Sequence, residues 1–215
     1  MIIVMLKGGL GNQMFQYAYA YALSNKLKVA MGINTEWFKT YGNGHAELRL
    51  NEFQLLKFPP YEPYVKTDGI ILDGYFQIPM AFNEYREELK SIFVHTHDYL
   101  PEDSIVIHIR RNDYVELGRS FDEEYYHRLV ERFRNPIIFS DDPEWARQFG
   151  HVYESRGVVS DMLTMSTAKT IVIGNSTYSW WAAYLSNSND IWYPKEILTH
   201  CNPRIVEGLE WNRIE

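Results

Sequence analysis

The sequence predicts an α/β fold in which two Rossmann-like domains each carry a parallel sheet. An apolar run at residues 2–6 stops at two glycines and precedes a helical pattern from about residue 12 to residue 27. A polar segment with one proline, residues 95–104, separates two halves of the chain. Beyond it, apolar runs alternate with helical patterns, which is typical of a parallel sheet with helices on both faces.

The first half, residues 1–98, has two more predicted strands, near residues 29–33 and 70–72. A helix is expected from Pro79 to about Lys90, because proline is favoured in the first turn of a helix. The stretch 35–67 is interrupted by glycines and prolines, so it predicts loops and short pieces.

The second half, residues 99–215, continues the alternation. Its strands are expected near residues 105–109, 136–139, 151–153, 170–173 and 190–193, and its helices near 122–133, 143–148, 160–168 and 178–186. The length of 215 residues suits either two domains of about a hundred residues or one larger domain. We expect two domains divided after residue 98, with the last residues free to pack back on the first.

The composition excludes several classes of function. A net charge of -7 argues against generic nucleic-acid binding, which needs a broad basic face. The single cysteine, Cys201, rules out an intrachain disulfide framework and agrees with a reducing compartment. Residues 1–6 are too few for a signal-peptide core, and no run approaches the roughly 20 apolar residues of a membrane span. We expect a soluble, cytoplasmic protein of undetermined oligomeric state.

Two adjacent arginines end the predicted strand 105–109, in the string His108-Ile109-Arg110-Arg111-Asn112-Asp113. They lie at the carboxyl end of the strand, where open α/β sheets bind their ligands. Neighbouring side chains alternate across a strand, so one guanidinium can face a ligand while the other holds the loop. The pair predicts a phosphate clamp, and a solvated strand end is the alternative.

The glycine turn before the first helix resembles nucleotide-binding motifs only in part. Gly9 and Gly11 match the start of a dinucleotide fingerprint, but its third glycine falls on Met14. The string also lacks the lysine and hydroxyl residue that end a P-loop, which argues against a nicotinamide enzyme or a nucleoside triphosphatase. A simple tight turn explains the glycines but leaves Asn12 and Gln13 unexplained.

A third string, Gly174-Asn175-Ser176-Thr177-Tyr178-Ser179, follows an apolar strand and opens a helix. Hydroxyl side chains at a helix amino terminus either cap the helix or help its N–H groups bind phosphate, and both can hold together. The next residues, Trp180 and Trp181, are expected to pack against the sheet.

The sequence indicates no metal site. No pair of spaced carboxylates of the D-x-D kind is present, and Asp141 and Asp142 precede Pro143 as a helix start would. His95 and His97 have no further ligands at matching spacing. We therefore expect a reaction without metal or other cofactor.

The three strings, in this order, resemble the bacterial α1,2-fucosyltransferases of glycosyltransferase family eleven. The resemblance spans residues 1 to about 195 and includes the linking phrases at 72–77 and 139–142. It implies a GT-B-like fold, with an acceptor-side domain at 1–98 and a GDP-sugar-binding domain at 99–215 facing each other across a cleft. The implied reaction is inverting transfer of L-fucose from GDP-β-L-fucose to the 2-hydroxyl of a terminal galactose.

The resemblance also implies roles for individual residues. Arg110 contacts the departing pyrophosphate, and Asp113 and Glu116 are candidates for a general base. Asp161 reads the guanine base, as a matching aspartate does in the related α1,6-fucosyltransferases, and a helix-terminal carboxylate is the alternative. The other residues expected at the donor are His108, Arg111, Asn175, Ser176, Thr177, Ser179, Gly9, Gly11, Asn12 and Gln13.

Two short loops leave the identity of the acceptor glycan and of the donor sugar undetermined. Only residues 114–120 separate the arginine motif from the next predicted helix, and the stretch 35–67 is compact. A different glycan, or a different deoxysugar donor, is therefore compatible with the chain. The alternatives are a transferase of another nucleotide-activated sugar and a non-catalytic protein of the same fold that binds a glycan or nucleotide.

Overall fold

The structure, a computed structural model, describes residues 1–41, 46–53, 69–195 and 203–215. The chain forms two compact units. The first comprises Met1–His95 and His200–Gly208, and the second comprises Thr96–Thr199 and Leu209–Glu215. The break after His95 lies at the start of the predicted polar segment 95–104, and the chain rejoins the second unit for its last residues.

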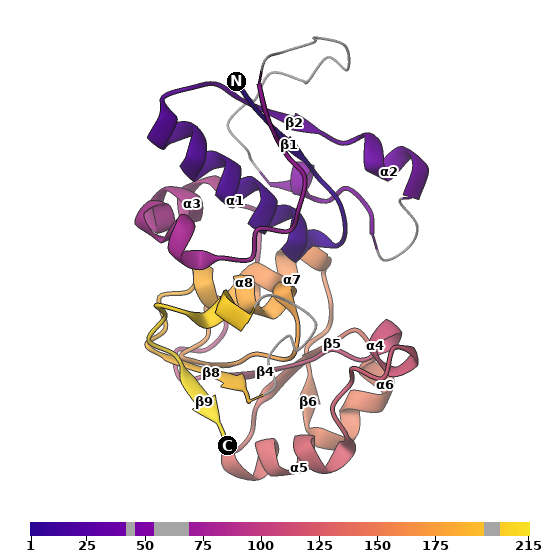
Figure 1. The fold of residues 1–215 in the computed structure, drawn as a ribbon. Coiled ribbons are helices and arrows are strands. Elements are labelled where there is room, and N and C mark those ends of the chain that lie inside the picture. Colours follow the sequence, from indigo (N-terminus) through magenta and orange to yellow (C-terminus); the bar gives the residue numbers. More distant parts are fainter. Residues whose placement is uncertain (42–45, 54–68, 196–202) are drawn as a thin grey trace. The chain divides into compact units, whose positions relative to one another are not determined.

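The first unit contains a three-stranded parallel sheet with the order β2-β1-β3 (Figure 1). The strands are β1 (Ile2–Met5), β2 (Met31–Asn34) and β3 (Ile70–Leu72). Helix α1 (Leu10–Leu27) follows β1 after a turn in which Gly8 has a φ of 77°, a conformation that favours glycine. The predicted strand, glycine turn and helix are confirmed.

One part of the first unit differs from the prediction. The expected helix 79–90 consists of 3-10 turns at Pro79–Ala81 and Asn83–Tyr85, followed by helix α3 (Arg86–Ile92). The helix is interrupted at Phe82, which has a φ of -132° and is fully buried with its ring against Phe15. Packing of this aromatic ring overrides the local helical preference. The stretch expected to give loops and short pieces contains, in its described part, a short helix, α2 (Glu36–Tyr41), and a 3-10 turn at Leu50–Glu52, as predicted.

The second unit contains a six-stranded sheet with the order β6-β5-β4-β7-β8-β9, in which every pair of neighbours is parallel. Its strands are β4 (Ile105–Ile109), β5 (Ile137–Ser140), β6 (His151–Val152), β7 (Thr170–Val172), β8 (Asp190–Pro194) and β9 (Asn212–Ile214). The prediction of a parallel sheet and of its first five strands is confirmed, whereas β9 was not predicted because three residues give no clear apolar pattern.

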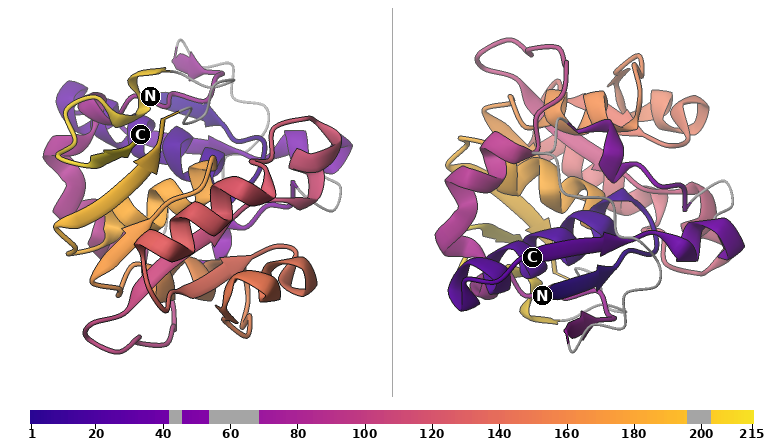
Figure 2. Two further views of the ribbon diagram at one scale, coloured as in Figure 1. Left: turned by 90° about the horizontal axis from the view of Figure 1, so that it is seen from below. Right: turned by 90° about the horizontal axis from the view of Figure 1, so that it is seen from above.

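Helices cover both faces of this sheet, as Figure 1 and Figure 2 show. They are α4 (Asn112–Glu116), α5 (Glu123–Arg132), α6 (Pro143–Ala146), α7 (Val158–Met165) and α8 (Thr177–Leu185). Helix α5 lies on one face, and α7 and α8 lie against each other on the other. Only α4 was not predicted among these helices; it occupies the region expected to be a loop after the arginine motif.

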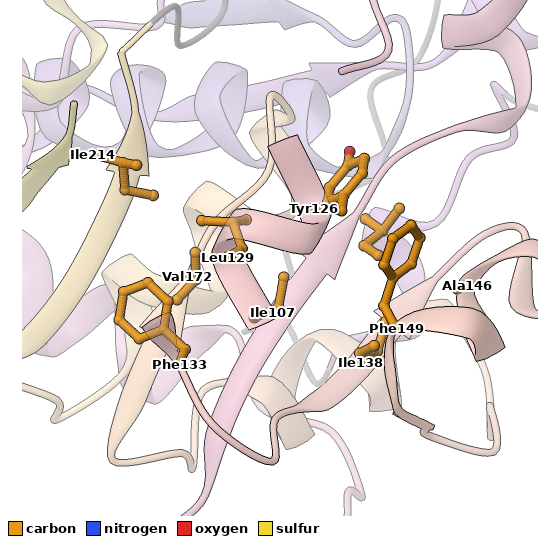
Figure 3. Close-up of a cluster of buried hydrophobic side chains, with 10 residues drawn as sticks. Ile107, Tyr126, Leu129, Phe133, Ile138, Ala146, Phe149, Val172 and Ile214 are labelled. Carbon is orange, nitrogen blue, oxygen red and sulfur yellow. The ribbon is translucent and has the colours of Figure 1, made fainter. Parts of the chain in front are cut away.

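A cluster of buried apolar side chains joins α5 to the sheet (Figure 3). Tyr126, Leu129 and Phe133, at helical spacing, pack on Ile107 of β4 and Ile138 of β5. On the other face, Trp180 and Trp181 of α8 are fully buried, so the expectation that they pack in the core is confirmed. Core packing therefore fixes strand β4 from both sides.

The order of the strands locates a topological switch point. From β4, the chain moves outward through β5 and β6 and then returns to β7 on the opposite side of β4. The sheet order is that of the Rossmann fold, in which ligands bind outside the carboxyl ends of the two strands where the order reverses. Those strands are β4 and β7.

No helix among the described residues is both long enough and apolar enough to cross a membrane.

Gly174, the second residue after β7, is expected to tolerate no side chain. A Cβ atom there would lie 2.7 Å from the backbone oxygen of His108, and backbone cannot move aside easily. Gly174→Ala should therefore lower the free energy of unfolding by about 1–3 kcal/mol. Urea denaturation would measure the change. An alanine variant as stable as the parent would show that β4 and β7 are not held this close.

Candidate functional site

Three loops meet at the carboxyl edge of the six-stranded sheet. Arg110 and Arg111 follow β4, Asp141 and Asp142 follow β5, and Gly174 leads from β7 into α8. The register pairs Ile109 of β4 with Ser140 of β5, so the residues that follow each strand are neighbours. Because parallel strands end at the same edge, segments far apart in the sequence form one polar cluster.

The guanidinium of Arg110 lies between two carboxylates. Its Nη2 donates a hydrogen bond of 2.5 Å to Asp113 Oδ1. Its Nη1 lies 2.7 Å from Asp141 Oδ2 in an ion pair that departs from hydrogen-bond geometry. A guanidinium carries five N–H donors, so those not directed at the two carboxylates remain for a ligand. The two carboxylates therefore orient the guanidinium of Arg110.

Arg111 contacts the segment that follows β5. Its Nε donates to Asp142 Oδ2 at 3.0 Å, and its guanidinium lies 3.8 Å from the centre of the Trp145 ring. The Oδ1 of Asp142 accepts a hydrogen bond from the backbone N–H of Trp145 and so caps helix α6, as the sequence suggested. The prediction that one guanidinium faces a ligand while the other holds the loop stays a prediction, since both are paired with carboxylates and are similarly exposed.

Asp141 is a site residue that the sequence reasoning missed. Its Oδ1 accepts the backbone N–H of Arg111 at 2.8 Å, while its Oδ2 pairs with Arg110. Its backbone oxygen accepts a hydrogen bond of 2.7 Å from the side chain of Asn112. Asp141 thus contacts both arginines, whereas the side chain of Asp142 pairs with the guanidinium of Arg111 alone. The signal was the position of Asp141-Asp142 at the end of the strand that neighbours the arginine strand.

His108 is buried beneath this cluster. Its side chain is 5% exposed, and its ring lies 5.5 Å from the ring of Tyr178 in α8. Burial, and secondarily the charge of Arg110, lowers the pKa of the imidazole to about 3, so the ring is neutral near pH 7. Its Nδ1 has no hydrogen-bond partner among the described residues. A contact between His108 and a nucleoside stays a prediction.

The start of helix α8 has the geometry of a capped amino terminus. Ser176 is the N-cap, and its Oγ accepts the backbone N–H of Tyr178 at 3.3 Å. Ser179 is fully buried; its hydroxyl donates to Ser176 O and accepts Gly174 N–H, so it shapes the turn from inside. Asn175 is buried, whereas Thr177 is half-buried in the first turn. Capping leaves other N–H groups of that turn available to an anion.

Asp161 lies in the first turn of α7, but it does not cap the helix. The N-cap position is Gly157, and the carboxylate of Asp161 reaches back to the preceding loop. There it accepts the backbone N–H of Arg156 at 2.9 Å and the hydroxyl of Ser155 at 2.5 Å. Each carboxylate oxygen has a second lone pair, so further donors can bind. Reading of guanine by Asp161 stays a prediction.

Helix α4 places the two candidate bases three residues apart on one side of the helix. Asp113 already accepts a hydrogen bond from Arg110, whereas Glu116 is exposed. Both residues follow β4, as Arg110 does.

In the first unit, Gln13 differs from the expectation that it binds a ligand. Its Nε2 donates to Gly8 O and Glu47 O, and its Oε1 accepts the backbone N–H groups of Arg49 and Leu50. The two donors and two acceptors of the amide are thus all used by the backbone, and the side chain is fully buried. Gln13 ties the segment at residues 47–50 to the glycine turn.

The other three expected residues of the turn, Gly9, Gly11 and Asn12, differ in their accessibility. Gly9 is the N-cap of α1, with a φ of -70° that any residue can adopt, and Gly11 is buried within the helix. Asn12 is half-exposed, and its Oδ1 accepts a hydrogen bond of 2.9 Å from Gln77. Of the expected residues in this turn, Asn12 is therefore the one whose side chain is both oriented and accessible.

Among the described residues, no three histidine, cysteine, aspartate or glutamate side chains lie together as potential metal ligands.

Comparison with known proteins places the chain among glycosyltransferases. The model of a family described as Glycosyl transferase family 11 matches residues 43–196. The alpha-1,2-colitosyltransferase of Escherichia coli is 28% identical, over 100% of this chain and 99% of that protein. The O-antigen biosynthesis glycosyltransferase WbnK of Escherichia coli is 26% identical, over 86% and 90%. The galactoside 2-alpha-L-fucosyltransferase Sec1 of Mus musculus is 26% identical, over 89% and 66%.

Solved structures with the same fold include the heptosyltransferase WaaC of E. coli with ADP-2-deoxy-2-fluoro heptose. It has a TM-score of 0.53 and 7% sequence identity, covering 100% of this chain and 92% of that one. The same enzyme with ADP has a TM-score of 0.50 and 9% identity, covering 100% and 93%. Together with the parallel sheets, these similarities confirm the predicted α/β fold of the GT-B type.

The buried, neutral His108 should make the protein less stable in acid. Because its pKa is lowered on folding, the unfolded chain binds more protons below pH 6.5, so stability falls as the pH falls. Between pH 7 and pH 5, this group should contribute a loss of about 2 kcal/mol. Urea unfolding of the parent and of His108→Gln at both pH values would measure the difference.

The matched control is His127→Gln, because His127 is half-exposed on α5. We expect this variant to keep the acid sensitivity of the parent. Equal acid sensitivity in the parent and in His108→Gln would contradict the assignment of a neutral, buried imidazole.

Proposed function

Because the chain belongs to glycosyltransferase family 11, we propose that it moves L-fucose from GDP-β-L-fucose to the 2-hydroxyl of a terminal galactose, with inversion. The observation that carries this proposal is that Arg110 follows β4 and the amino terminus of α8 follows β7, the two strands of the switch point in the six-stranded sheet. This is the place where Rossmann-like sheets bind nucleotides. In this proposal the second unit binds the donor, and the first binds the acceptor.

The chemical task of the second unit is to stabilise the charge of the departing GDP. Two guanidiniums face three carboxylates in the cluster, so net positive charge does not supply the attraction. Directed hydrogen bonds supply it instead. The free N–H groups of Arg110 and those of the first turn of α8 are held in place before the sugar nucleotide binds. Preorganised donors of this kind typically contribute about 10²–10³ each in rate.

Asp113 and Asp141 give Arg110 its orientation in this mechanism. They hold the plane of the guanidinium from two sides, which reduces the side-chain entropy lost on binding phosphate oxygens. Removal of the proton from the acceptor hydroxyl is assigned to Asp113 or Glu116. Asp113 would have to give up its hydrogen bond from Arg110 to act as the base. Glu116 is exposed and would not have to leave Arg110.

A second donor is favoured by one comparison. The relative that is 28% identical over the whole chain is named an alpha-1,2-colitosyltransferase. Colitose differs from L-fucose by the absence of the 3-hydroxyl. The two donors can therefore bind the same nucleotide site and be transferred to the same linkage. A pocket that hydrogen-bonds the 3-hydroxyl would reject colitose, whereas an apolar one would discriminate little between the two.

The test of the function is incubation of the full chain with a panel of sugar nucleotides, including GDP-fucose, GDP-colitose and several UDP-sugars. We expect release of GDP from GDP-fucose that increases with lactose and is unaffected by EDTA. Faster release from GDP-colitose would establish the second donor. Release from UDP-sugars alone would contradict the guanine assignment, and no release from any donor would support a non-catalytic binding protein.

Arg110→Lys should lower the rate of transfer by about 10²-fold, although it keeps the charge. Lysine cannot reproduce the planar set of N–H donors that a guanidinium presents to phosphate oxygens. Steady-state kinetics with GDP-fucose would measure the loss. Arg128→Lys, on the exposed side of α5 beside Glu124, is the matched control and should be fully active. A near-normal rate for Arg110→Lys would rule out the clamp.

Asp161→Asn should weaken the binding of GDP by about 1–3 kcal/mol, because an amide presents a donor where guanine also presents donors. Calorimetric titration with GDP would measure the change. Asp122→Asn provides the control, since Asp122 caps helix α5 and touches no proposed ligand site. If GDP binds equally well to both variants and to the parent, Asp161 only holds the loop at Ser155 and Arg156.

A further inference from the structure

A group of polar and aromatic side chains lies at the carboxyl edge of the three-stranded sheet in the first unit. We call it the Tyr75 cluster; it consists of Lys7, Asn12, Asp73, Tyr75 and Gln77. The parallel register pairs Val4 of β1 with Leu72 of β3, so the residues after these strands run side by side. The glycine turn before α1 and the segment at residues 72–77 therefore meet in space.

Lys7 and Asp73 form an ion pair beside an exposed aromatic ring. The Nζ of Lys7 lies 2.6 Å from Asp73 Oδ1 and 5.5 Å from the centre of the Tyr75 ring. Asp73 is 65% exposed and Tyr75 is 46% exposed, so both are accessible from solvent. The carboxylate keeps most of its lone pairs free for further donors.

Gly8 forms the floor between Tyr75 and Asn12. A Cβ atom on Gly8 would lie 3.0 Å from Asn12 Nδ2 and 3.3 Å from Tyr75 Cε1, and the residue has a φ of 77°. Glycine is favoured here by its conformation, and a side chain would also crowd the ends of Asn12 and Tyr75. The absence of a side chain brings the amide of Asn12 close to the ring of Tyr75.

The amide of Asn12 is oriented for an external acceptor. Its Oδ1 accepts a hydrogen bond from Gln77, which is buried, so its Nδ2 is the group left to donate. Among the residues that the structure describes, Nδ2 of Asn12 donates to no hydrogen-bond partner. Phe76, between Tyr75 and Gln77, has a φ of 48° and stacks on Tyr19. On either side of it, Tyr75 is exposed and Gln77 is buried.

The chemistry of the cluster selects a neutral, hydroxyl-rich ligand with one apolar face. The charges of Lys7 and Asp73 cancel, so a phosphate group gains no attraction. The face of a tyrosine ring is electron-rich and suits the C–H groups that line one side of a pyranose ring. Around it stand a carboxylate that accepts and an amide that donates, the pair of functions that sugar hydroxyls need.

We propose that the Tyr75 cluster binds a galactopyranose of the acceptor, with the sugar against the Tyr75 ring and its hydroxyls hydrogen-bonded to Asp73 and Asn12. The identity of this sugar as the acceptor rests on the proposed function; the binding itself requires no donor.

The test is saturation-transfer difference NMR of the full chain with lactose and with methyl β-D-galactopyranoside, without nucleotide. We expect Tyr75→Ala and Asp73→Asn each to weaken lactose binding about tenfold, the effect of losing one good contact. Tyr75→Phe keeps the aromatic face and should bind nearly as well as the parent. Titration with GDP should give the same affinity in all of these variants, which also reports that they are folded.

Two matched controls come from the second unit. Tyr99→Ala removes a tyrosine that is 80% exposed, and Asp103→Asn disrupts an ion pair with Lys169 of the same 2.6 Å length. Both should bind lactose like the parent. The proposal is overturned if the parent binds neither sugar, or if Tyr75→Ala and Asp73→Asn bind lactose as the parent does.

The outcome is separable from that of the donor experiment. Sugar binding that depends on Tyr75, with no release of GDP from GDP-fucose, would leave this site standing and remove the proposed reaction. Normal turnover of GDP-fucose, with unchanged lactose affinity in Tyr75→Ala and Asp73→Asn, would support the proposed reaction and remove this sugar site.

Discussion

The parallel pairing of β4 with β5 on one side and β7 on the other is the constraint on which the candidate donor site depends. It brings the arginines after β4, the aspartates after β5 and the turn into α8 to one edge. The close approach of His108 and Gly174 sets the spacing of β4 and β7, because backbone meets backbone there. Apolar packing on both faces keeps β4 in place.

Under the proposed function, the site at this edge binds an anion without being strongly basic. Arg110 is paired to Asp113 and Asp141, and Arg111 is paired to Asp142. Partly buried pairs of this kind contribute little net stability, since desolvation offsets much of the attraction. Their effect is geometric: they fix the direction of the remaining N–H groups. Selection of a ligand then depends on the positions of donors, which suits a planar nucleotide and its phosphates.

The same construction appears, with different chemistry, in the first unit. There the pairing of β1 with β3 brings Lys7 beside Asp73 and Tyr75, and Gly8 allows the close approach of Asn12. In both units the functional side chains stand on loops at the carboxyl ends of parallel strands. The second unit offers a cluster rich in guanidinium and N–H donors, and the first offers a neutral cluster with an aromatic face. This division matches a nucleotide on one unit and a sugar on the other.

The sequence by itself determined the class of fold, because hydrophobic periodicity and glycine turns are local signals. It also determined the arginine motif, the cap at Ser176 and the burial of Trp180 and Trp181. It failed where a distant contact overrides a local preference, as at Phe82, where ring packing interrupts the expected helix.

Only the tertiary structure decided which polar residues hold the protein together and which face outward. Gln13 and Ser179 belong to motifs that suggested ligand binding, yet their hydrogen bonds are used inside the fold. Asp141 looked like part of a helix start and proved to be the partner of both arginines. The reason is physical: a side chain's partners are set by strand register across thirty residues or more of chain, and no local pattern encodes that distance.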